Sequence, residues 1–185
     1  MRKILFLLLV LSASKNFACT CHGYDLKREL RFTTAILHAR VLKIDYVVKG
    51  EIFTKQELQY LENKFESQPK MLNVFQRKSV TKVEIEIVDT YKGDMDRTRL
   101  TIYTSMHGPS CGYFGFEVGK EFIVFLHPER LSKRFFGDYN KGINPNRLWT
   151  NRCTRTMIFD KTKAGEIIKE LKSLELSSNK QLLIQ

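Results

Sequence analysis

Four cysteines are the residues of this 185-residue chain whose spacing says most about its chemistry: Cys19, Cys21, Cys111 and Cys153. An even number of cysteines in an exported chain predicts two disulfides. A bond between the first two would close a very small, strained ring, so we expect each of them to bond one of the distant cysteines. In the chain-entropy model, loops this long contribute roughly 4–5 kcal/mol per bridge. The arithmetic leaves both such pairings open.

A zinc site is the alternative use of the same cysteines. Structural zinc usually takes pairs of cysteines separated by two to four residues. This chain has one pair separated by a single residue and two isolated cysteines. The spacing therefore disfavours zinc, and we expect neither a metal nor another cofactor.

The four histidines are His22, His38, His107 and His127, and none is spaced as a helical metal pair. His38 and His127 lie in predicted strands, where a structural histidine with satisfied hydrogen bonds is the simpler interpretation. His22 and His107 lie near cysteines, but a cysteine held in a disulfide offers no thiolate for a catalytic dyad. The chain also lacks a Gly-rich phosphate loop and a G-x-S-x-G motif. We predict a protein that is not an enzyme.

The first 18 residues have the pattern of a signal peptide. Arg2 and Lys3 precede an apolar run at 4–11 (ILFLLLVL), and residues 12–18 are a short polar stretch that ends in a small residue. The run is too short to span a bilayer, and a buried N-terminal helix is the alternative. Cleavage after residue 18 would make Cys19 the first residue, although lipidation of that cysteine stays open. We expect a soluble, secreted protein, with the periplasm or the cell surface as alternatives.

The net charge is strongly positive, at +11 from 31 basic and 20 acidic residues. Removal of the first 18 residues, which hold three basic residues and no acidic one, leaves 28 minus 20, or +8. Such a charge attracts acidic polymers or acidic proteins, and a basic surface without a specific partner is the alternative. Basic and aromatic residues alternate at 130–141 (RLSKRFFGDYNK), as in grooves that bind single strands. Because an exported protein rarely meets nucleic acid, we interpret this stretch as an exposed loop and expect no nucleic-acid partner.

Alternating apolar and polar residues predict a mainly β fold. Strands are expected at 33–48, 80–91, 98–104 and 121–127, with a shorter strand leading into Cys153. The first of these strands is long, and we expect it to bend. Val83, Ile85 and Ile87 face one side of the second strand, and Lys82, Glu84 and Glu86 face the other. Five or so short strands with flanking helices fit a small closed barrel such as the OB-fold.

A long connection between the first two strands carries a helical signal. Thr54 to Glu57 has the form of a capping box. Leu58, Leu61 and Phe65 follow at helical spacing. This predicts a short helix over about 55–66, ending before Pro69, as an insertion at 51–77. A disordered basic loop is the alternative.

The C-terminal part of the chain is predicted to be a helix capped by Thr162. Its apolar stripe consists of Ile167, Ile168, Leu171 and Leu174. Packing of this stripe on the barrel is the simple interpretation, and a partner-binding helix is the alternative. The predicted organisation is a signal peptide at 1–18, one domain at 19–176 and a flexible tail at 177–185.

The predicted mature start is Cys19-Thr20-Cys21. This Cys-x-Cys resembles the opening of the tissue inhibitors of metalloproteinases, which have a netrin-like domain. Later stretches resemble the family's first two strands, its cysteine loop, its glycine turn before a buried strand and its last partner cysteine: Ala39-Arg40-Val41, Tyr91-Lys92-Gly93, Ser110-Cys111-Gly112, Val118-Gly119-Lys120-Glu121-Phe122 and Cys153. The resemblance covers about residues 19–175.

The resemblance implies an OB-like barrel in which Cys19 bonds Cys111 and Cys21 bonds Cys153. It also implies a monomeric inhibitor whose partner is a zinc metalloprotease. The α-amine and carbonyl of Cys19 would chelate the protease's catalytic zinc and replace its water. Thr20 would enter the pocket beside the metal. The other residues expected to contact the protease are Cys21, His22, Ser110, Cys111 and Gly112.

The chain also departs from the family's pattern. It has no third disulfide in this domain and no cysteine-rich second domain, and the insertion at 51–77 is long. His22-Gly23 stands where a proline usually follows the second cysteine. The alternative function is therefore a secreted, non-inhibitory binding module for a protein or a polyanion.

Overall fold

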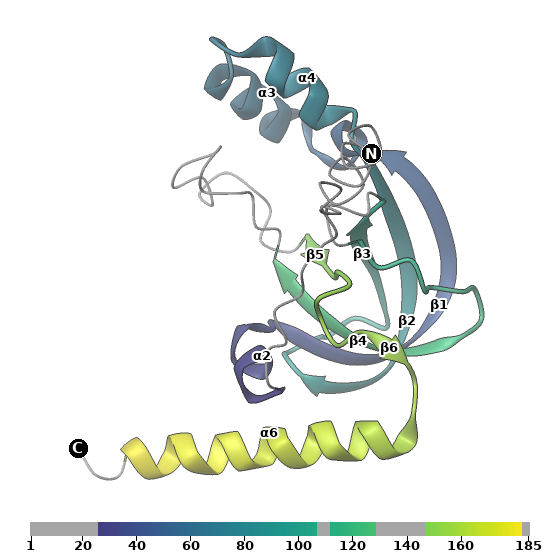
Figure 1. Ribbon diagram of the computed structural model, residues 1–185, viewed down its shortest axis with the longest axis vertical. Helices are drawn as coiled ribbons and strands as arrows, with labels where there is room; N and C mark the ends of the chain where they lie inside the picture. The colour runs from purple at the N-terminus through teal and green to yellow at the C-terminus, as the bar shows by residue number, and fades with distance from the viewer. Residues whose placement is uncertain (1–25, 107–111, 129–146, 183–185) are drawn as a thin grey trace, which may run out of the picture.

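The computed structural model describes residues 26–106, 112–128 and 147–182, which form a mainly β structure with several helices (Figure 1). The strands are β1 (Ala35–Val48), β2 (Ser79–Lys92), β3 (Arg99–Ser105), β4 (Glu121–Pro128), β5 (Leu148–Trp149) and β6 (Met157–Ile158). The helices are α2 (Leu26–Phe32), the 3-10 helix η1 (Lys49–Ile52), α3 (Lys55–Lys64), α4 (Pro69–Gln76) and α6 (Lys161–Leu182). The strands expected from the sequence are confirmed to within about two residues, whereas α2, α4 and β6 were not predicted.

The six strands form one mixed sheet in which five strands close a ring. The sheet order is β1-β2-β3-β5-β4-β6, and β1 also pairs with β4. The β3–β5 pairing is parallel, and the other pairings are antiparallel. Irregularities at three places along β1 interrupt its register with β2, and such bulges bend a strand. The predicted bend of the first strand is confirmed (Figure 1), because β1 curves far enough to pair with a strand on each side.

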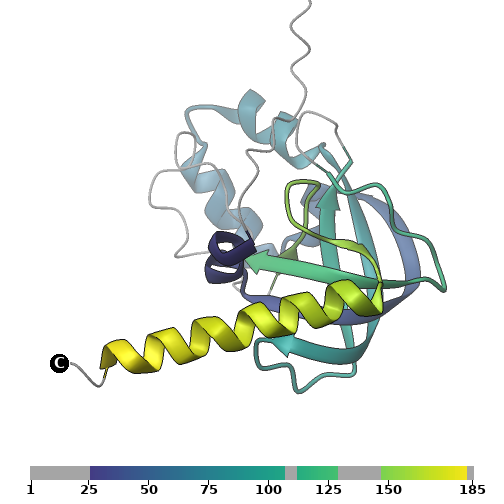
Figure 2. The ribbon, with the colours of Figure 1, turned by 60° about the horizontal axis from the view of Figure 1, so that its bottom comes forward.

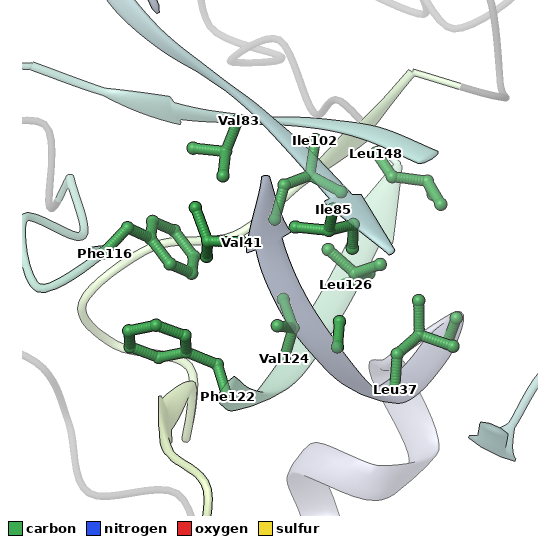
Figure 3. Close-up of a cluster of buried hydrophobic side chains, with 12 residues drawn as sticks. Leu37, Val41, Val83, Ile85, Ile102, Phe116, Phe122, Val124, Leu126 and Leu148 are labelled. Carbon is green, nitrogen blue, oxygen red and sulfur yellow. The ribbon is translucent and has the colours of Figure 1, made fainter. Parts of the chain in front are cut away.

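The main hydrophobic core fills the interior of the ring (Figure 3). Val83 and Ile85 on β2 are buried there, and Ile87 packs against the same cluster, as the alternation of that strand predicts. The other buried members come from the remaining ring strands and the segment before β4: Ala35, Leu37, Ala39, Val41, Ile102, Phe116, Phe122, Val124, Leu126 and Leu148. Each large side chain buried in this way contributes roughly 1.5–3 kcal/mol relative to exposure.

A second apolar layer lies outside the ring, between β4 and the helices α2 and α6 (Figure 2). Ile123 and Phe125 point outward from β4 into this layer, so β4 is buried on both faces. Ala164 and Ile167 are buried there, with Leu171 and Leu174 packed beside them. Three of the four residues of the predicted stripe therefore pack on the sheet, and the fourth, Ile168, is half-buried outside this cluster. The described helices include none that is both long and apolar enough to cross a membrane.

The N-terminus of α6 corrects one prediction. The side chain of Asp160 accepts a hydrogen bond from the Lys163 backbone N–H at 2.9 Å. Asp160 therefore caps the helix, and the predicted cap, Thr162, lies exposed within the first turn. The helix continues to Leu182, and the flexibility of residues 177–185 stays a prediction.

The long β1–β2 connection forms a small helical unit with its own core. Thr54 and Glu57 make both hydrogen bonds of the predicted capping box, at 3.2 Å and 2.7 Å. The helix ends at Lys64, before Pro69 as expected, but Pro69 then begins a second helix. Proline is well suited to the first position of a helix, where its missing N–H costs nothing. The core of this helical insertion consists of Phe53, Leu61, Phe65, Leu72 and Phe75.

Candidate functional site

Most of the residues predicted to act on a partner lie outside the described ranges: Cys19, Thr20, Cys21, His22, Ser110 and Cys111. The predicted signal peptide at 1–18, His107 and the basic loop at 130–141 also lie outside them. Gly112 and Cys153 are described. Cys153 is disulfide-bonded, and its partner is not among the described residues. The predicted pairings therefore stay predictions, and the structure informs them through the residues around Gly112 and Cys153.

Gly112 lies directly against the end of β3. It is buried, and a Cβ atom at this position would overlap the carbonyl oxygen of Ser105. The next residue, Tyr113, donates its backbone N–H to the buried Thr104 Oγ1 at 2.7 Å. Only glycine permits so close a backbone approach. The segment that follows Cys111 is thus packed tightly on the C-terminal end of β3.

Cys153 lies in a turn organised by Asn151. The Asn151 side-chain oxygen accepts hydrogen bonds from the backbone N–H groups of Cys153, at 2.7 Å, and Thr154, at 3.1 Å. The side-chain nitrogen of Asn151 lies 3.1 Å from His127 Nε2. An asparagine that bonds the backbone two residues ahead is a common way to fix a turn. The position of Cys153 is therefore set by short-range hydrogen bonds and by β4.

Three threonine hydroxyls attach this turn to the ring. Thr150 Oγ1 lies 2.6 Å from Thr156 Oγ1 and 2.9 Å from Thr154 Oγ1. Thr156 also accepts the Phe125 backbone N–H at 3.0 Å, and Thr150 donates its N–H to the Tyr103 carbonyl at 2.9 Å. No motif in the sequence predicts this network. The only local signal was a cluster of threonine and asparagine after a short strand, which is typical of side-chain-stabilised turns.

Helix α2 is bound to the same turn through Glu29. One carboxylate oxygen accepts the Arg155 backbone N–H at 2.8 Å, and the other lies 3.3 Å from Arg155 Nε. Burial raises the pKa of Glu29, and the bonds from Arg155 act against that rise. At the other end of α2, Lys92 Nζ donates to the carbonyl oxygens of Leu30 and Thr33. The helix that begins five residues after Cys21 is thus held beside the turn that contains Cys153.

Together these contacts define what we call the cysteine end of the ring, marked by Gly112 and Cys153. Strands β3 and β5 are parallel, with Tyr103 opposite Trp149. The C-terminal ends of parallel neighbours lie at the same edge of a sheet. Gly112 packs on the end of β3, and Cys153 follows β5 closely. Gly112, the neighbour of Cys111, and the turn that contains Cys153 therefore both follow the C-terminal ends of these two parallel strands.

The two described histidines have structural surroundings, as expected for histidines in strands. His38 Nε2 lies 2.8 Å from Glu121 Oε2, and its ring stacks on Phe159 with centroids 3.8 Å apart. His127 contacts Asn151, as described above, and the Pro128 carbonyl oxygen at 3.1 Å. Within the described ranges, no group of three or more His, Cys, Asp or Glu residues is arranged to hold a metal ion.

A groove of about 400 Å³ lies elsewhere, on the outer face of the ring beside the helical insertion. Its lining consists of Leu42, Ile52, Thr54, Glu84, Arg97, Arg99, Leu100, Thr101, Tyr103 and Arg147. Arg147 is buried and donates to Glu57 Oε2 at 2.7 Å and to the Ile52 carbonyl at 2.8 Å. No local pattern in the sequence predicts this groove, because its residues come from three strands, the insertion and the residues that precede β3 and β5.

Comparisons with known proteins identify no relative. No protein-family model matches the chain, and no curated protein matches it. A functional assignment therefore depends on the residues of the chain and on the geometry described above.

Proposed function

We propose that this protein is a secreted inhibitor of zinc metalloproteases, similar in mechanism to the tissue inhibitors of metalloproteinases. The observation that carries the proposal is the cysteine end, where Gly112, the neighbour of Cys111, packs on the end of β3 and Cys153 follows the adjacent parallel strand β5. The order of the ring supports an OB-fold-like barrel, since β4 returns to lie beside β1 after a β1-β2-β3 meander, as in a Greek key.

The spacing of the cysteines fits this arrangement. Cys19 and Cys21 are only two residues apart, and the Cα atoms of a disulfide lie about 4.4–6.8 Å apart. Their two partners must therefore lie near one another, as residues beyond the ends of two adjacent parallel strands can. The Glu29–Arg155 contact supports Cys21–Cys153 in particular, because it holds α2, which begins five residues after Cys21, beside the Cys153 turn. Cys19 then bonds Cys111.

The proposed mechanism uses the backbone of the first mature residue. The α-amine and carbonyl oxygen of Cys19 bind the protease's catalytic zinc at the position that water normally occupies. Two disulfides hold this edge rigid, which lowers the ordering cost of binding. An α-amine has an ordinary pKa of about 8, and only its neutral form has a lone pair for the metal. Inhibition is therefore expected to weaken as the pH falls below neutrality.

The test is an inhibition assay of the mature protein against a panel of metalloproteases. One added alanine before Cys19 moves the α-amine out of reach and leaves both disulfides possible. We expect it to weaken inhibition at least tenfold, or about 1.4 kcal/mol, without lowering the melting temperature. Equal inhibition by the extended and unextended proteins contradicts the zinc-chelating mechanism.

A pair of glycine variants tests the geometry of the cysteine end. Gly112→Ala forces the segment after Cys111 away from Ser105, so inhibition should weaken. Gly165→Ala is the matched control, because no atom lies within 4 Å of the added methyl group and the residue lies within α6. Equal inhibition by both variants, with both disulfides mapped as intact, would show that the placement of Cys111 does not matter to the inhibitor.

The second candidate function is a secreted binding module that inhibits no protease. The positive charge of the chain and the arginines at the outer groove favour it. This function predicts tight binding to an acidic partner and no inhibition across the protease panel, a combination that the inhibitor proposal does not allow.

A further inference from the structure

We propose that the groove on the outer face of the ring binds an acidic peptide segment, with a carboxylate on Arg97 and Arg99 and an apolar side chain beside it. The groove is lined by β3 from Arg99 to Tyr103, whereas Gly112, which marks the cysteine end, packs on Ser105 at the end of that strand. The inference therefore goes beyond protease inhibition and does not depend on it.

The floor of the groove is the outward-facing side of the ring. Thr101 and Tyr103 on β3 alternate with Ile102, which points into the core. In the parallel pairing of β3 with β5, Ile102 lies opposite Leu148. Arg147 is therefore adjacent to Thr101 in the register and completes the floor.

The apolar side chains in the walls are those of Leu42 and Ile52. Leu42 lies at an irregularity of β1, between Val41 and Lys43, which are both paired with residues of β2. Ile52 and Thr54 belong to the start of the helical insertion. Leu100 borders the groove at the start of β3, although its side chain packs against the core of the ring. Pockets of 300–1,000 Å³ with apolar walls and a few placed polar groups are typical ligand sites. At about 400 Å³, this groove has room for a few side chains of a peptide.

Two guanidinium groups give the groove its preference for an anion. Arg97 and Arg99 are exposed, and neither has a carboxylate within ion-pair distance among the described residues. The guanidinium fork matches a carboxylate with two parallel hydrogen bonds. A carboxylate in the groove would satisfy groups that the described fold leaves without an ionic partner.

Two acidic groups near these arginines are already engaged by cations. Glu84, which lines the groove, lies 3.7 Å from Lys82 Nζ. Glu86, opposite Arg99 in the register, accepts a hydrogen bond from Arg40 at 3.3 Å. These acids weaken the attraction for a long, uniformly charged polymer such as a sulfated polysaccharide. Together with the apolar walls, they favour a peptide that alternates acidic and apolar residues.

The wall on the side of the helical insertion is held in place before any ligand arrives. Arg147 joins Glu57 and the Ile52 carbonyl, and its guanidinium lies 4.6 Å from the centre of the Phe53 ring. All of these groups are buried or half-buried. A groove with fixed walls loses little conformational freedom on binding.

The experiment measures binding of a fluorescent peptide of alternating glutamate and leucine to the full mature chain. The matched probes are the same peptide with glutamine in place of glutamate, and a sulfated heparin hexasaccharide. We expect the acidic peptide to bind at least tenfold more tightly than the glutamine peptide. We also expect the hexasaccharide to displace the bound acidic peptide poorly. If only the hexasaccharide binds, the protein recognises a polyanion and the peptide proposal is wrong.

Two double variants with the same charge change locate the site. Arg97→Glu with Arg99→Glu should weaken acidic-peptide binding at least tenfold. Arg77→Glu with Lys78→Glu alters two exposed residues outside the groove and should weaken it less than threefold. Thr101→Trp, which fills the groove without changing charge, should also abolish binding, with circular dichroism checking the fold of each variant. Equal losses in the two charge variants, or full binding by Thr101→Trp, would overturn the proposal.

Discussion

The ring and the helical insertion are stabilised in different ways. Buried aliphatic and aromatic side chains fill the interior of the ring, and no charged residue belongs to that cluster. The insertion has a small core of five buried residues, and a buried ion pair fastens it to the ring. The side chains of Arg147 and Glu57 are only 4% and 7% exposed, with nitrogen and oxygen 2.7 Å apart.

The difference shows how a small unit can hold a fixed position on a larger one. Apolar packing is non-directional and grows with the area buried, so the ring draws its stability from many residues together. The insertion buries little surface of its own and depends on directional contacts with a few ring residues. Lys49 Nζ, for example, lies 4.4 Å from the Phe75 ring centre and 5.0 Å from that of Trp149.

The largest effect is expected from a cavity in the ring. Phe122 is fully buried, with its ring edge-on to Phe116 at 5.0 Å and to Tyr113 at 6.4 Å. Phe122→Ala should lower the free energy of unfolding by about 3–5 kcal/mol, measured by urea denaturation. Phe75→Ala makes the same change in the insertion and should cost less, because that core is small and close to the surface. A larger loss from Phe75→Ala would mean that the insertion, not the ring, dominates stability.

Breaking the buried ion pair should have the next largest effect. Arg147→Met removes the guanidinium group that pairs with the buried Glu57 carboxylate, at a cost of about 3 kcal/mol. A second substitution, Glu57→Leu, removes the buried carboxylate, so the double variant should regain most of the loss. The remaining loss in the free energy of unfolding reflects the lost capping box, at about 1 kcal/mol. If the double variant is as unstable as Arg147→Met, the ion pair itself is a net source of stability.

A smaller and more local effect is expected from the helix cap. Thr54→Ala removes the side-chain acceptor for the Glu57 backbone N–H and should cost about 1 kcal/mol. Thr54→Ser keeps the hydroxyl and is the control. Hydrogen exchange should speed up at α3 amides in the alanine variant and stay unchanged in the ring strands. Faster exchange throughout the ring would show that the two regions unfold as one unit.

The smallest effect concerns Glu121 and Glu29, whose pKa values are shifted in opposite directions. Hydrogen bonds from Arg40, and then from His38, lower the pKa of Glu121 below its ordinary value of 4.5. Glu121 thus contributes stability above pH 4.5 that is lost as the pH falls through its folded pKa. Burial raises the pKa of Glu29, so ionised Glu29 costs stability that is regained as the pH falls through its folded pKa toward 4.5.

The glutamine variants should therefore respond to pH with opposite signs. Relative to the wild type, Glu121→Gln should become less stable as the pH rises through 4.5, and Glu29→Gln should become more stable above that pH. Each change should stay within about 1 kcal/mol, since Glu121 is partly exposed and Arg155 offsets the burial of Glu29. Urea midpoints at pH 4 and pH 7 measure the difference. Shifts of the same sign in both variants contradict this assignment.

The sequence by itself determined the local elements and their inner faces. The alternation in 80–91 predicts which side of β2 is buried, and the capping box at Thr54 predicts where α3 begins. Both signals depend on residues a few positions apart, whose relative placement follows from the geometry of a strand or a helix. They carry no information about which distant element covers the buried face.

The tertiary structure alone decided the pairings over long sequence distances. The second pairing of β1, with β4, closes the ring, and the parallel β3–β5 pairing brings Gly112 and Cys153 to one end. Arg147 meets Glu57 across 90 residues of sequence. Asp160 rather than Thr162 caps α6, because β6 ends at Ile158 and the helix begins at Lys161, directly after Asp160. Such contacts arise from register and packing between elements, which no local pattern of residue types contains.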